Sequence, residues 1–196
     1  MALHGEVWFP SVIWAGQVLN VDFDAIQSHA YQLQLHDEGV YKSNFNAWQS
    51  NDILNIATEE YDPLINTLNQ EISEITSSVG LPTLELQGMW ININPQHGYN
   101  ITHDHPGSVL SGVVYIAAEE DQGCLVFERS DSAQYFLPSV ITNANNFNVS
   151  SCRYNPKTSR MYVFGSWMKH YVEPNNSNTD RISISFNYGV AKNGNA

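Results

Sequence analysis

The segment NITHDHPGSVLSGVVYI, residues 100–116, combines metal-binding side chains with the pattern of a β-strand. His103 and His105 lie two positions apart, and Asp104 stands between them. Residues i and i+2 of an extended segment face the same side, so the two imidazoles converge while the carboxylate points away. Neutral imidazole nitrogens suit divalent iron, zinc, copper and nickel. The spacing therefore predicts two metal ligands on one strand face, although a bulge at Pro106 could instead turn Asp104 inward.

A second set of polar side chains lies on strands near the C-terminus. The sequences HYVEP, NNSNTD and RISISFN together predict an antiparallel hairpin in which His170 lies opposite Ser183. Arg181 and Ser183 then share one face, and WININ repeats this alternation with Asn92 and Asn94. Inward polar side chains cost stability unless a ligand satisfies them. A metal with a small anion would satisfy them, because arginine donates two parallel hydrogen bonds to a carboxylate.

The elements that must position these residues form an α+β, mainly β pattern. Apolar residues at helical spacing predict helices over 21–35 and 59–80, and residues 7–19 read as two short strands around Pro10. From residue 84 the apolar period changes to two. The strands predicted from this period cover 84–94, 107–117, 123–128, 161–165, 170–174 and 181–190. This order indicates an antiparallel β-sandwich or jelly roll with the helices packed on its outer face.

Length and composition indicate one folded domain over residues 1–196. The chain has 196 residues and 42% hydrophobic residues, which is enough for a substantial core. We expect residues 1–83 to form N-terminal strands and supporting helices, and residues 84–196 to form the β core. The stretch 129–160 is rich in Asn and Ser and is expected to be a long loop, with short strands, that acts as a lid over one end.

Charge and cysteine content exclude several functions. The net charge is −12, with 20 acidic residues against 8 basic ones, so a nucleic-acid substrate is disfavoured. No apolar run approaches the ~20 residues of a membrane helix, and the N-terminus lacks the pattern of a signal peptide. Cys124 and Cys152 are expected to be free thiols. These features predict a cytoplasmic protein.

Three ordered motifs resemble the Fe(II)/2-oxoglutarate-dependent oxygenases, and in particular a branch of them found in marine bacteria and their phages. The first motif is SN…WQS at residues 43–50, and the second is H-x-H-P-x-S-x-x-S-G-V-x-Y at residues 103–115. The third is W-x-x-H-x-V-x-P…R-I-S-I-S-F-N at residues 167–187. The resemblance spans residues 8–190. It implies a double-stranded β-helix, which is a jelly-roll or cupin-like barrel, with Fe(II), 2-oxoglutarate and O2 at its open end.

The resemblance also implies a metal-ligand set. It assigns His103, His105 and His170 as ligands, with Asp104 as the alternative second ligand. Most of the superfamily use Asp or Glu at the second position, whereas strand parity favours His105 in this sequence. Neutral ligation leaves the iron one unit more positive, which should strengthen its hold on an anionic keto acid.

Co-substrate contacts follow from the same resemblance. Arg181 would pair with the C5 carboxylate of 2-oxoglutarate, and Ser183 would assist it. The other residues assigned to this group are Asn92, Asn94 and Tyr115.

The implied reaction is decarboxylation of 2-oxoglutarate to succinate and CO2, coupled to hydroxylation of an unactivated C–H bond. The substrate could be a peptidyl side chain, an amino acid or a small metabolite, and a homodimer is left open. A phage-encoded enzyme would act in the host cytoplasm. Two alternatives remain: a three-histidine iron dioxygenase that does not use 2-oxoglutarate, and a non-enzymatic β-sandwich binding or virion-associated module.

Overall fold

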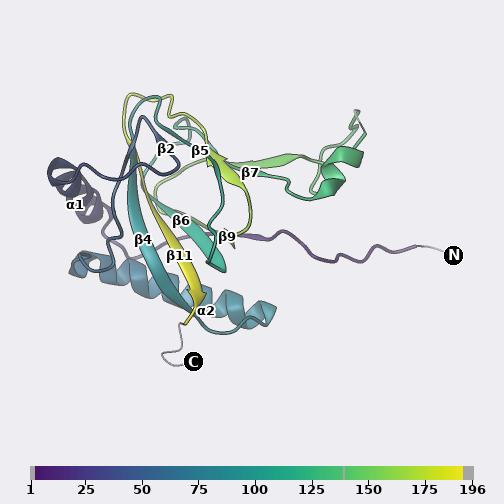
Figure 1. The fold of residues 1–196 in the computed structure, drawn as a ribbon, viewed down its shortest axis with the longest axis horizontal. Helices are drawn as coiled ribbons and strands as arrows, with labels where there is room; N and C mark the ends of the chain where they lie inside the picture. Colours follow the sequence, from purple (N-terminus) through teal and green to yellow (C-terminus); the bar gives the residue numbers. More distant parts are fainter. Residues whose placement is uncertain (1–2, 139, 192–196) are drawn as a thin grey trace.

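Two antiparallel β-sheets and two α-helices make up the structure, a computed structural model that describes residues 3–138 and 140–191 (Figure 1). The helical elements are α1 (Phe23–His36), η1 (Glu59–Tyr61), α2 (Asp62–Val79) and η2 (Ser132–Phe136). One sheet contains β1 (Ile13–Gln17), β3 (Trp48–Gln49), β4 (Leu84–Asn94), β6 (Leu110–Ala117), β9 (Arg160–Gly165) and β11 (Arg181–Val190). The other contains β2 (Asn44–Phe45), β5 (Tyr99–His103), β7 (Leu125–Glu128), β8 (Ser151–Tyr154) and β10 (His170–Val172).

The strand order shows two separate sheets. The larger sheet runs β1-β9-β6-β11-β4-β3 and the smaller runs β2-β5-β10-β7-β8. The prediction of a mainly β fold with two helices and antiparallel sheets is therefore confirmed. The predicted jelly-roll barrel is not closed, because no strand pair joins one sheet to the other in the described residues. The architecture is an open jelly roll of two facing sheets.

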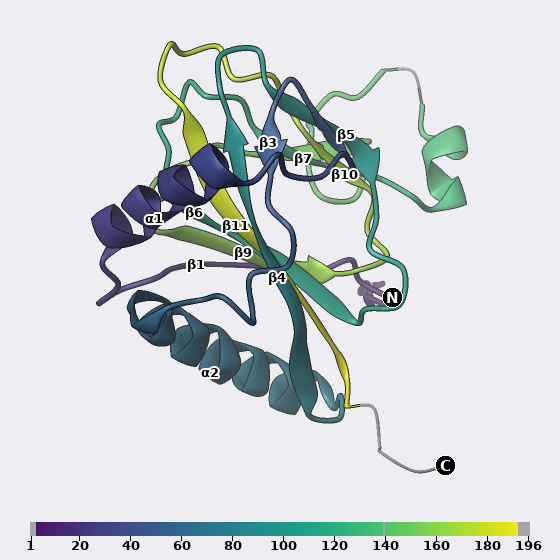
Figure 2. The same ribbon diagram turned by 60° about the vertical axis from the view of Figure 1, so that its left-hand side comes forward.

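Both helices lie against the larger sheet (Figure 2), and they share one hydrophobic core with it. Ile91 and Ile184 on the central strands belong to the same buried cluster as Ile26 of α1 and Leu64 of α2. Because side chains alternate along a strand, this apolar face leaves the polar residues of β4 and β11 on the side of the smaller sheet. The apolar packing on one face thus determines which residues line the space between the sheets.

The helix ends follow from local sequence. The carboxylate of Asp22 caps α1 by accepting a hydrogen bond from the Ala25 backbone N–H, at 3.0 Å. Helix α2 ends at Gly80, which has a φ of 71° in the left-handed region that glycine adopts without strain. Both helices therefore begin and end close to the predicted positions.

The predicted C-terminal hairpin is wrong. Strand β10 pairs with β5 and β7 in the smaller sheet, whereas β11 pairs with β4 and β6 in the larger one. His170 therefore lies opposite His103 across the β10–β5 pair and not opposite Ser183. The intervening segment crosses between the sheets, and the Asn175 side chain holds it by donating to the carbonyls of Asn94 and Thr179 at 2.9 and 2.7 Å. The alternation within β11 is unaffected by this change of partner.

Three segments differ from their predicted form. In the N-terminal segment only Ile13–Gln17 forms a strand, and residues 3–12 extend away from the sheets (Figure 1). The sequence reasoning did not identify β5. The region 129–160, expected to be a lid, contains η2 and β8 and projects from the end of β7 (Figure 1). That this region closes over the site stays a prediction. The division of the chain into residues 1–83 and 84–196 also stays a prediction. Within the described residues, neither helix combines the length and apolar character that crossing a bilayer requires.

Candidate metal centre

Three histidines from different segments meet between the two sheets. His103 ends β5, His170 begins β10, and His105 lies in the connection to β6. One ring nitrogen from each lies within 4.8 Å of the others. The Nε2 atoms of His105 and His170 are 3.3 Å apart, close to the roughly 3 Å that separates two nitrogens bound side by side to one ion at ~2.1 Å. The cluster therefore has the composition and spacing of a metal site.

Backbone carbonyls fix the orientation of two of these rings. The Nδ1 of His103 is 2.8 Å from the Ile101 carbonyl, and the Nδ1 of His170 is 2.8 Å from the Met168 carbonyl. Because a carbonyl only accepts, each Nδ1 must carry the proton, which leaves Nε2 with a lone pair for a metal. This second-sphere arrangement commonly orients histidine ligands in metalloproteins.

Burial keeps all three imidazoles neutral. Burial, together with the neighbouring histidines, lowers the pKa of His105 to about 4 and that of His170 to about 3. The pKa of His103 is also lowered by burial, against opposing effects of the Ile101 carbonyl and Asp104. Neutral imidazole is the form that binds a cation, so the site is prepared for a metal at any pH near neutrality.

The cluster contains no carboxylate ligand. Among the described residues, the group whose ligand atoms lie within 4.8 Å of one another comprises three histidines and does not include Asp104. The connection after β5 thus places His105, and not Asp104, beside His103 and His170. Asp104 remains close enough for its negative charge to oppose the pKa lowering of His103 and His105.

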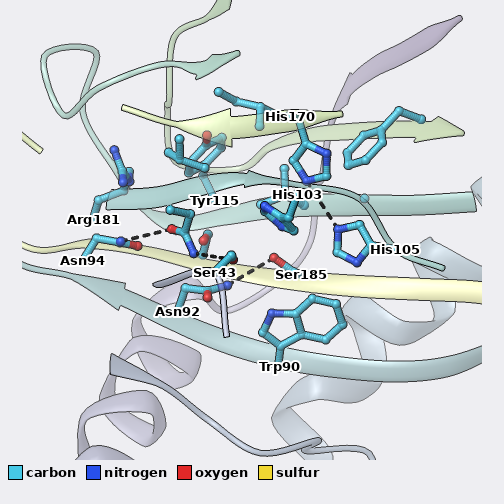
Figure 3. Close-up of a pocket in the computed structure, with 17 residues that line it drawn as sticks. Ser43, Trp90, Asn92, Asn94, His103, His105, Tyr115, His170, Arg181 and Ser185 are labelled. Atoms are coloured by element: carbon cyan, nitrogen blue, oxygen red, sulfur yellow. Dashed lines mark hydrogen bonds between the residues drawn. The ribbon is translucent and has the colours of Figure 1, made fainter. Parts of the chain in front are cut away.

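Arg181 lies at the other end of the same cavity (Figure 3). Its side chain is 1% exposed, and Nη1 donates to the backbone carbonyls of Gln122, Gly123 and Glu173. Its Nη2 has no hydrogen-bond partner among residues 3–138 and 140–191. A buried charged donor without a partner is costly, so this end of the cavity is suited to an anion.

Polar side chains line the cavity between Arg181 and the histidines. Asn92, Asn94, Tyr115, Ser183 and Ser185 come from the central strands of the larger sheet. Nδ2 of Asn92 donates to the Ser185 hydroxyl at 3.1 Å, whereas Oδ1 of Asn92 is buried without a partner. Tyr115 is 2% exposed, and burial raises the pKa of its hydroxyl. The structure therefore brings the predicted site residues into one cavity, with the exception of Asp104, the alternative ligand.

Several lining residues escaped the sequence reasoning. Asn100 lies on β5 and bridges two others, because its Oδ1 accepts from Asn94 and its Nδ2 donates to the Ser43 hydroxyl. Ser43 was noted as part of a motif but was given no role. Alternation along the strand does predict that Ser185 shares the face of Arg181 and Ser183, but it predicts no role for this side chain.

A family model described as "Putative 2OG-Fe(II) oxygenase" matches residues 88–187. This span covers half of the chain and includes all the cavity residues predicted from the sequence.

The chain belongs to the 2-oxoglutarate- and iron(II)-dependent oxygenases. Fe(II) is the metal of this family, 2-oxoglutarate its co-substrate and O2 its oxidant.

Solved structures share the fold at low sequence identity. The epimerase SnoN from nogalamycin biosynthesis is 14% identical with a TM-score of 0.67, over 91% of this chain and 78% of SnoN. A Pseudomonas putida prolyl-4-hydroxylase is 15% identical with a TM-score of 0.62, over 91% of this chain and 92% of its own. HygX from Streptomyces hygroscopicus, solved with nickel and 2-oxoglutarate, is 10% identical with a TM-score of 0.62, over 91% of this chain and 83% of HygX. No curated protein matches the sequence.

The residues of the cavity fit the family's metal and co-substrate. Three neutral nitrogen donors with fixed orientation suit a divalent first-row metal. The unpartnered Nη2 of Arg181 provides a donor for a carboxylate, and the unpartnered Oδ1 of Asn92 is an acceptor in the same cavity. These orphaned polar atoms indicate that the cavity is built to hold a polar ligand.

Proposed function

We propose that this chain is a hydroxylase whose iron is held by three histidines, His103, His105 and His170. One observation carries this proposal: the three imidazoles and the unpartnered Nη2 of Arg181 lie in a single cavity between the sheets. In this proposal each histidine binds the metal through Nε2, and the protein contributes no negative charge to the metal.

The co-substrate lies between the metal and Arg181. Nη2 of Arg181 donates to the C5 carboxylate of 2-oxoglutarate, and the hydroxyls of Ser183 and Tyr115 add donors. Asn92 and Asn94 contact the ligand from β4. The bound iron, 2-oxoglutarate and O2 supply the oxidising chemistry, and succinate and CO2 are released. The role of the chain is to position the two ends of the co-substrate and to exclude water.

Hydroxylation is the outcome that we propose for the substrate, an unactivated C–H bond in a peptidyl side chain, an amino acid or a small metabolite. The fold alone is compatible with other outcomes, because similar structures include the epimerase SnoN and the carbocyclase SnoK as well as the prolyl-4-hydroxylase. The reaction is therefore tested by its products.

The free Nη2 of Arg181 argues against the two alternatives. A three-histidine dioxygenase that ignores 2-oxoglutarate would have no need of a buried guanidinium with an unused donor. A structural β-sandwich would satisfy the same donor with one of its own acids, since an unpaired buried charge is destabilising.

The decisive experiment is turnover of 2-oxoglutarate by protein reconstituted anaerobically with Fe(II) and then exposed to O2. We expect succinate in the absence of added substrate, and none from a His170→Ala variant. Iron-loaded protein that forms no succinate would support the 2-oxoglutarate-independent alternative. Protein that binds less than a tenth of an equivalent of iron would support the non-enzymatic one. With a substrate in hand, one oxygen atom from labelled O2 in the product would demonstrate hydroxylation.

A further inference from the structure

Arg181 carries a buried positive charge with no carboxylate partner in the described part of the chain, although the chain has 20 acidic residues. Burial lowers the pKa of its guanidinium, and Tyr115, Cys124 and Glu173 oppose that effect. Glu173 is the carboxylate in that set. Its backbone carbonyl accepts from Nη1 of Arg181 at 3.1 Å, so the residue lies directly against the guanidinium.

Other groups hold the carboxylate of Glu173. Its Oε1 lies 2.7 Å from Nη1 of Arg153, and its Oε2 accepts from the Cys124 backbone N–H at 3.1 Å. Arg153 lies on β8, the edge strand of the smaller sheet, and its side chain is 58% exposed. Both oxygens of Glu173 are thus engaged by groups other than Arg181.

We propose that Arg153 is a positioning residue that keeps the Glu173 carboxylate away from Arg181, so that Arg181 stays available for the carboxylate of the co-substrate. This inference rests on the proposed role of Arg181. A side chain whose own backbone contacts the guanidinium needs only rotamer changes to approach it. A released Glu173 would therefore compete with 2-oxoglutarate as an intramolecular ligand, at the high effective concentration of a tethered group.

A purely structural ion pair makes a different prediction. If the Arg153–Glu173 pair only stabilised the β8 edge of the smaller sheet, loss of either partner would have the same effect, and loss of both would restore nothing. If Glu173 is a competitor, the partners are not equivalent. Loss of Arg153 releases the competitor, whereas loss of the Glu173 charge removes it.

The test measures the dissociation constant of 2-oxoglutarate by calorimetry on the full chain loaded with Mn(II) under anaerobic conditions. We expect Arg153→Gln to weaken binding by about three- to tenfold, Glu173→Gln to leave it unchanged or tighter, and the double variant to return within about twofold of wild type. Arg153→Lys should retain tight binding. Arg160→Gln removes the same charge from a residue with no ion pair among the described ones and should have no effect.

Kinetics provide an independent readout. Arg153→Gln should raise the apparent KM for 2-oxoglutarate in succinate formation and leave kcat at saturation unchanged. The inference is overturned if Glu173→Gln weakens binding as much as Arg153→Gln, or if the double variant fails to recover. If the wild-type protein itself binds no 2-oxoglutarate, the proposed function fails as well, so the two failures are distinguishable.

Discussion

Replacing Arg181 with lysine should separate the two tasks of this side chain. Nη1 donates to three backbone carbonyls, and Nη2 is free to contact a ligand. A lysine ammonium has three donors and could satisfy the three carbonyls, but it has no second nitrogen to present to the cavity. We therefore expect the free energy of unfolding of the metal-free variant to lie within about 1 kcal/mol of that of the wild type. Its affinity for 2-oxoglutarate should fall sharply.

The expected loss of affinity follows from the missing hydrogen bond. A hydrogen bond to a charged group contributes about 1.5–3 kcal/mol, which corresponds to roughly 10- to 150-fold in the dissociation constant. Calorimetry on the Mn(II)-loaded protein measures the affinity, and urea unfolding of the metal-free protein measures the stability. If the lysine variant binds 2-oxoglutarate within twofold of wild type, the free Nη2 is not the anchor. If it is destabilised by several kcal/mol, the carbonyl contacts need the planar guanidinium.

Three further predictions concern the metal and the core. His105→Ala should abolish Fe(II) binding in an equilibrium titration, whereas Asp104→Asn should change the affinity less than threefold; the reverse order would show that the carboxylate is the ligand. The metal-free protein should become less stable as the pH falls through 6.5. His105 and His170 have pKa values of about 4 and 3 in the folded protein, so they take up protons in the unfolded chain first, and this favours unfolding. The loss should reach about 3 kcal/mol by pH 5.5 for the two groups together, and a flat urea-unfolding profile between pH 7.5 and 5.5 would contradict the burial argument. Gly112→Ala should destabilise the protein by about 1–3 kcal/mol in the same unfolding assay, because the new Cβ would lie 2.3 Å from the Phe186 ring; an unchanged midpoint would mean that the ring moves freely.

Side-chain alternation explains which parts of the site could be predicted. The period-two pattern gave the bounds of β4 and β11 and the inward direction of Arg181, because direction depends on the strand alone. Pairing partners depend on the path of the chain in space. The turn-rich segment before Arg181 suits a tight hairpin, but in the structure it crosses to the other sheet, where Asn175 anchors it.

Short polar strands explain most of what was missed. Strand β5 has five residues and begins after a turn at Pro95–Gly98, so the sequence YNITH carries little periodic signal. Asn100 therefore could not be placed, and neither could its bridge between Asn94 and Ser43. Parity in an extended segment predicted that His103 and His105 face the same side, whereas His170 was assigned through the resemblance to a known family. The arrangement around Arg181 needs two distant loops and left no local pattern.

The two ends of the ligand site belong to different sheets. His103 and His170 lie on the smaller sheet, Arg181 lies on the larger one, and a sheet-crossing loop joins them. The distance from metal to guanidinium is thus a property of how the sheets stack. The buried residues that pack between the sheets, and so act as the spacer, are Tyr115, Leu125, Phe127, Tyr162, Phe164 and Met168. In the proposed binding mode, the thickness of this layer would set the carbon-chain length of the keto diacid that can span from the histidines to Arg181.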